Sequence, residues 1–181
     1  MTTLPDPETL VELNDPRIRD VLGHLFEPCP VLCDFLIKEV INKPFPSYTS
    51  LIESSRKELL QFLEKEETES TVSPDIASII SAHPRLGPSK DKLSSHSTSE
   101  QKSLEGSKEE AQKLADLNAK YETTFPGLRY VVFVNGRSRE TIMENMIERI
   151  QRNDISAERR EAFNAMCDIA LDRARKLGAK L

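Results

Sequence analysis

Residues 157–177 read AERREAFNAMCDIALDRARKL, and their apolar side chains recur at the spacing of one helix face. Residues three and four apart lie on the same side of an α-helix. Arg173 falls near the centre of this face. Because arginine is almost never left unpaired in a core, Arg173 should snorkel to solvent, pair with a carboxylate, or bind an anionic substrate. The apolar face comprises Phe163, Met166, Ile169, Ala170, Ala174 and Leu177.

The same periodicity runs through most of the chain and predicts a helical protein. Six glycines, no tryptophan and abundant Glu, Lys, Leu, Arg and Ala favour helices over a sandwich or a doubly wound sheet. A length of 181 residues suits one core. We therefore predict an all-α, single-domain bundle of about eight helices over residues 1–181. The other apolar stripes lie within residues 18–26, 31–41, 51–63, 76–83, 104–121 and 142–150.

Local signals suggest where some of these helices begin and end. Ser50 followed by Glu53 resembles a capping box that opens a helix ending near Leu63. The acidic residues 64–71 then resemble an exposed loop. Residues 130–135 are β-branched enough to be extended, either as a short strand or as a buried linker.

Composition excludes several classes of protein. A formal charge of −5 and a pI near 5.4 offer no basic surface for nucleic acid. No apolar stretch of about 18 residues is available for a membrane span. The first residues also lack the basic and apolar run of a signal peptide. We therefore expect neither a nucleic-acid partner nor a membrane location.

Neither the cysteines nor the histidines have the spacing of metal ligands. The three cysteines form an odd set and suit buried thiols in a reducing compartment. The three histidines share no local ligand spacing, so we expect no metal site. These residues are Cys29, Cys33, Cys167, His24, His83 and His96.

His83 stands directly before Pro84, where an apolar helical stripe must stop. Ser73-Pro74-Asp75 supplies a cap, an N1 proline and an acid for the start of that helix. Pro84 disfavours helical geometry at the residue before it, so His83 should lie at the helix end beside unpaired carbonyls. Such a histidine is either a hydrogen-bonded core residue or a group for proton transfer.

The polar stretch of residues 85–99 is a candidate active-site loop. At its end, Ser97 and Glu100 have the spacing of a capping box for the following helix. The same hydroxyl and carboxylate can face a ligand while they cap the helix, because backbone NH groups at a helix N-terminus suit an anion.

Six short motifs follow one another along the chain, and together they resemble the 2-oxo-4-hydroxy-4-carboxy-5-ureidoimidazoline (OHCU) decarboxylases. That family is all-helical, usually dimeric and free of cofactors, and it converts OHCU to (S)-allantoin in urate breakdown. The motifs are Phe26-Glu27-Pro28-Cys29-Pro30, Ala82-His83-Pro84-Arg85-Leu86-Gly87, Ser97-x-x-Glu100-Gln101, Leu117-Asn118-x-x-Tyr121, Gly136-Arg137-Ser138-Arg139-Glu140 and Ile169-Ala170-x-x-Arg173.

The resemblance implies roles for individual residues and a homodimer that binds a small ureidoimidazoline substrate without a cofactor. It makes His83 the essential histidine, with Glu100 and Arg173 as the other catalytic groups. It also implies that the substrate is contacted by Pro84, Ser97 and Gln101.

The chain ends in Ala179-Lys180-Leu181, a variant of the Ser-Lys-Leu peroxisomal address. Because many eukaryotic members of the family are peroxisomal, we expect a peroxisomal import receptor to recognise this tripeptide. The alternative location is the cytoplasm.

Two departures from the family pattern leave a second function open. The spacing from His83 to Glu100 is a few residues short, with Gly87 directly after Leu86. Residues 125–131 replace the usual Gly-Phe-Pro-Phe-Val type of segment. The alternative is a helical binding protein, non-catalytic or with another substrate, in which Arg173 and Glu100 form a buried ion pair.

Overall fold

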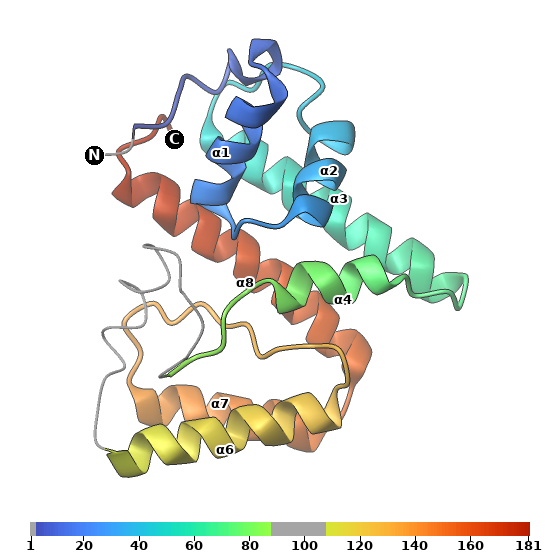
Figure 1. Cartoon of the computed structure of the whole chain (residues 1–181), viewed down its shortest axis with the longest axis vertical. Helices are drawn as coiled ribbons and strands as arrows, with labels where there is room; N and C mark the ends of the chain where they lie inside the picture. Colours follow the sequence, from blue (N-terminus) through green and yellow to red (C-terminus); the bar gives the residue numbers. More distant parts are fainter. Residues whose placement is uncertain (1–2, 88–107) are drawn as a thin grey trace.

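The computed structural model describes residues 3–87 and 108–181 (Figure 1). Within these ranges the protein has seven α-helices, one short 3-10 helix and no strand, as the all-α prediction requires. The 3-10 helix is η1 (Leu10–Glu12). The α-helices are α1 (Asp15–Leu25), α2 (Pro30–Glu39), α3 (Tyr48–Thr68), α4 (Pro74–Ser81), α6 (Lys108–Thr124), α7 (Arg139–Arg152) and α8 (Ile155–Lys176).

Helix α8 is the centre of the fold. It packs against α1, α3 and α4, while α6 and α7 pair with each other (Figure 1). Its buried side chains include several alanines, such as Ala162, Ala170 and Ala174, which allow neighbouring helices to approach closely. Three helices from the first half of the chain therefore meet along α8, and any side chain on α8 that faces inward lies near several elements.

Local caps set most of the helix starts. Ser73 caps α4 by accepting from the Asp75 amide, with Pro74 in the first turn, as the sequence predicts. Helix α3 differs from the prediction, because Ser47 rather than Ser50 is its N-cap and accepts from the Ser50 amide at 3.1 Å. Glu53 instead pairs with Arg56.

The predicted loop at residues 64–71 was wrong in its first part, because α3 continues to Thr68. Its apolar face ends at Leu63, which is fully buried, and the next turn extends beyond the core. Glutamate and lysine are good helix formers, so the backbone stays helical without a further buried face. Loss of the hydrophobic pattern therefore marked the end of the packing and not the end of the helix.

The segment after α6 is a buried linker, not a strand. Residues 128–134 have no regular structure, and Leu128, Tyr130 and Val131 are buried. The Arg149 guanidinium lies over the Tyr130 ring at 4.6 Å and donates to the Val131 carbonyl at 3.1 Å. The Arg149 side chain from α7 thus satisfies a backbone carbonyl that a neighbouring strand would otherwise bind.

None of the helices in the described ranges has the length and apolar character needed to cross a membrane.

Cys29, Cys33 and Cys167 are all free and buried, as expected. Burial raises the pKa of the Cys167 thiol to about 12 and also raises that of Cys33, so both thiols stay protonated near neutral pH.

Candidate active site

His83 lies just past the end of α4, where the sequence predicts it. Helix α4 buries Ile76, Ile79 and Ile80 and ends at Ser81. The His83 amide still donates to the Ile80 carbonyl at 3.2 Å, and its side chain is half-buried. A short helix anchored by three isoleucines therefore carries the histidine to a fixed place beside α8.

The backbone that follows His83 is held by α6 and by the linker. Asn118 of α6 donates to the Leu86 carbonyl at 2.9 Å. Arg85 forms two contacts of 2.6 and 2.7 Å with the Glu122 carboxylate. Arg129 of the linker donates to the His83 carbonyl at 3.3 Å. These contacts fix the loop after His83 to α6 and to the linker.

Gly87 completes this turn with a positive φ of 94°, which is strained for other residues. A Cβ atom there would lie only 3.0 Å from Leu114 Cδ2 of α6. The glycine thus lets the loop approach α6 closely, and Pro84 at the other end of the turn is half-buried beside His83.

Arg173 lies in the last turn of α8 and is buried, with 2% of its surface exposed. Its guanidinium donates to the Phe26 carbonyl at 2.8 Å and, more weakly, to the Leu25 carbonyl at 3.4 Å. It also pairs with Glu27 Oε1 at 2.9 Å. These acceptors belong to the C-terminus of α1 and the residue beyond it, where the helix dipole favours a cation. Arg173 therefore does not extend to solvent, so the snorkelling hypothesis is wrong. The predicted pairing with a carboxylate is confirmed.

His83 and Arg173 line the same cavity, although they are far apart in the sequence. The cavity has a volume of about 260 Å³ between α1, α2, α4 and α8, and Glu27 and Cys29 lie in its wall. It is narrow, with free space for roughly one water molecule, so any larger ligand would have to displace lining side chains. An imidazole, a guanidinium and a carboxylate thus share one small site.

The remaining predicted site residues, Ser97, Glu100 and Gln101, lie outside the described residues. Glu27 was missed as a site residue, although it stands inside a motif that carries the family resemblance. The available signal was a carboxylate directly after an apolar helix and before Pro28. That signal gives no indication of its partner, because the pairing depends on how α1 crosses α8.

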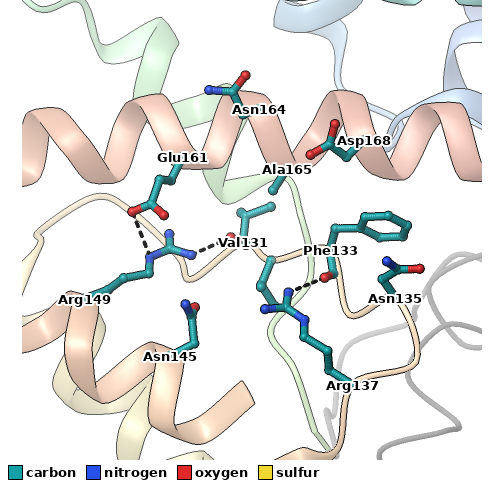
Figure 2. A pocket seen from close by; sticks show the side chains of 11 residues that line it. Val131, Phe133, Asn135, Arg137, Asn145, Arg149, Glu161, Asn164, Ala165 and Asp168 are labelled. Carbon is teal, nitrogen blue, oxygen red and sulfur yellow. Dashed lines mark hydrogen bonds and ion pairs between the residues drawn. The ribbon is translucent and has the colours of Figure 1, made fainter. Parts of the chain in front are cut away.

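A second, more open cavity of about 670 Å³ lies between the linker, α7 and α8 (Figure 2). Its charged side chains form hydrogen bonds and ion pairs with other groups of the same chain. Arg149 lies 3.6 Å from Glu161 and binds the Val131 carbonyl, while Arg137 donates to the Phe133 carbonyl (Figure 2). These contacts hold the linker, so we assign this cavity a structural role.

The buried network behind this cavity supports the same assignment. Glu158 is fully buried and accepts from Arg149 at 2.8 Å and from the Tyr121 hydroxyl at 2.6 Å. Burial, and then the Glu158 carboxylate, raise the pKa of Tyr121, so the phenol stays protonated and continues to donate.

Among the described residues there is no group of three or more potential metal-ligating His, Cys, Asp or Glu side chains.

Comparison with known families decides what scaffold this is. A family model for OHCU decarboxylase matches residues 11–175. The chain belongs to the OHCU decarboxylase family. A comparison with curated proteins finds no match. The match to OHCU decarboxylase spans His83, Glu27 and Arg173, and it implies a carboxy-lyase of purine catabolism.

Proposed function

We propose that this protein decarboxylates OHCU to (S)-allantoin without a cofactor. The observation that carries the proposal is the cavity that His83 and Arg173 line together. His83 and Arg173 belong to separate motifs of the family pattern. The packing of α4 against α8 brings them to one site. Two independent motifs that meet around a cavity favour chemistry there over a purely structural use of each residue.

The reaction needs little beyond proton transfer and charge stabilisation. The carbon–carbon bond to the carboxylate breaks, CO2 leaves, and the electron pair delocalises into the adjacent unsaturated imidazoline. A proton then adds from one face to the neighbouring carbon that bears the ureido group, which fixes the handedness of allantoin. The hydroxyl on the carbon that lost CO2 gives up its proton and becomes the carbonyl of the product. His83 acts on the substrate hydroxyl or carboxylate and assists delivery of this proton. Arg173 pairs with the substrate anion or with the developing negative charge.

The resemblance supplies the rest of the proposed site. Glu100 is the third catalytic group, and Gln101 orients the ureido NH groups with it. Ser97 and Pro84 contact the substrate. These assignments rest on motif positions, and the formation of allantoin by variants at each position tests them.

The test uses substrate generated enzymatically from urate and follows the circular dichroism of the allantoin formed. The His83→Asn variant should keep its helicity and lose nearly all stereospecific formation of allantoin. The His24→Asn variant is the matched control, because His24 lies on α1, pairs with Asp20 at 3.7 Å and is absent from the cavity wall. An active His83→Asn variant would remove the histidine from the mechanism.

A binding protein without turnover is the second candidate function. It is favoured by the narrow cavity and by the contact of Arg173 with Glu27. Thermal denaturation with allantoin separates the candidates. An active-site ligand stabilises the folded enzyme in a concentration-dependent way, whereas a filled-in cavity gives no shift.

We further propose a homodimer and import into peroxisomes through Ala179-Lys180-Leu181, with the cytoplasm as the alternative location. Leu181 is 52% exposed, and the Lys180 carbonyl accepts from the Tyr48 amide at 2.9 Å. A receptor that takes the tripeptide would therefore have to break this contact. A fluorescent fusion that ends in these residues should enter peroxisomes, and removal of Leu181 should leave it in the cytoplasm.

A further inference from the structure

Glu27 is a buried carboxylate in the wall of the cavity that contains His83 and Arg173. It is 7% exposed and follows Phe26, the C-cap of α1. Pro28 comes directly after it and restricts its backbone to extended conformations. The position of the carboxylate is therefore fixed by the end of α1 and not by a flexible loop.

The guanidinium of Arg173 is bound by three successive residues of this one segment. Leu25 and Phe26 offer carbonyl oxygens, and Glu27 offers a carboxylate oxygen 2.9 Å from Nη2. The carbonyls contact Nη1, whereas Glu27 contacts Nη2, so the two ends of the planar group are held separately. Contacts at two points prevent rotation of the guanidinium plane.

We propose that Glu27 is a positioning residue that fixes the direction of the Arg173 guanidinium toward the substrate anion. The inference rests on the proposed function of this site. The Glu27 carboxylate compensates the buried charge before substrate arrives, and it keeps the guanidinium donors in place during the reaction. Glu27 itself moves no proton and touches Arg173 rather than the reacting atoms.

The kinetic test compares Glu27→Gln with Asp172→Asn. Both changes replace a carboxylate by an amide of the same shape, and the two residues are similarly buried, at 7% and 8% exposure. Asp172 is the neighbour of Arg173 on α8, but it pairs with Arg175 and Lys176 and does not line the His83 cavity. It therefore controls for the loss of a buried carboxylate in itself.

We expect Glu27→Gln to lower kcat by about tenfold or more while KM changes much less, because misplacement of a positioned group mainly affects the transition state. Glu27→Asp keeps the charge with a shorter reach and should fall between Glu27→Gln and the native protein. Asp172→Asn should keep native kcat and KM. A Glu27→Gln variant with native kcat at a temperature where it is folded would overturn the proposal.

A measurement on Arg173 that needs no turnover separates the positioning role of Glu27 from the proposed decarboxylase activity. In nitrogen NMR of the native protein, the Arg173 Nη signals, assigned with Arg173→Lys, should show slow rotation of the guanidinium. Glu27→Asp or Glu27→Gln, whichever folds, should speed that rotation. Native rotation rates in the variants would show that Glu27 does not hold the group. If the native protein forms no allantoin, the decarboxylase proposal fails, while NMR still decides whether Glu27 fixes Arg173.

Discussion

The environment of Arg173 explains how a charged side chain occupies the centre of an apolar helix face. A guanidinium inside a protein is tolerated when its donors are satisfied and its charge is compensated. The end of α1 provides both, with two carbonyls at the negative end of the helix dipole and the Glu27 carboxylate beside them. The same groups that stabilise Arg173 in the core also orient it toward the cavity.

Removal of the guanidinium should therefore destabilise the protein more than its apolar volume suggests. Arg173→Met leaves the buried Glu27 without this counter-charge, and we expect a loss of about 3–5 kcal/mol in the free energy of unfolding. The double variant Arg173→Met with Glu27→Gln should regain part of that loss. Denaturant unfolding of the native protein, Arg173→Met, Glu27→Gln and the double variant gives the coupling free energy between the two side chains. Additive losses would show that the pair contributes no mutual stabilisation.

Individual helices could be predicted from the sequence because their signals are local. Apolar spacing located α8, and Ser73 was readable as the cap of α4. The errors at α3 were also local in origin. A serine three residues earlier made the cap, and strong helix formers carried the helix past its last buried leucine.

The contacts between helices could not be predicted in the same way. The position of His83 at the end of α4 followed from Pro84, but the residues that hold its loop did not. Asn118 and Glu122 lie on one side of α6 and meet this loop only after folding. Sequence spacing within a helix says which residues share a face, and it does not say which loop that face contacts.

This contact between α6 and the loop makes a prediction for Asn118. Asn118→Ala leaves the Leu86 carbonyl without its 2.9 Å donor, at a cost of about 1–2 kcal/mol in stability. Because that carbonyl lies close after His83, kcat/KM should fall as well. The control is Glu122→Gln, which weakens a half-exposed ion pair and should cost less than about 1 kcal/mol. Equal stability losses in the two variants would contradict the anchoring role of Asn118.

At the scale of the molecule, the arrangement around α8 places the proposed active-site cavity on one side and a structural one on another. The cavity with His83 lies against Ile169 and Arg173, whereas the second lies against Glu161, Ala165 and Asp168. The sequence revealed the first through family motifs. It gave little indication of the second, because Arg137, Arg149 and their partners satisfy backbone groups of a linker whose path is set by the whole fold.

Arg56 offers a test of whether the two sides of α8 unfold together. This residue of α3 contacts two residues of α8, with 2.9 Å to Asn164 Oδ1 and 2.6 Å to Asp168 Oδ1. Arg56→Met keeps much of the apolar stem and removes these bonds, so we expect a loss of about 2 kcal/mol in unfolding free energy. In a single cooperative domain the denaturation midpoint should fall with an unchanged slope, and kcat should stay native because Arg56 does not line the His83 cavity. Two separate transitions, one for helices α1–α4 and one for α6 and α7, would instead show that α8 joins two independently folding units.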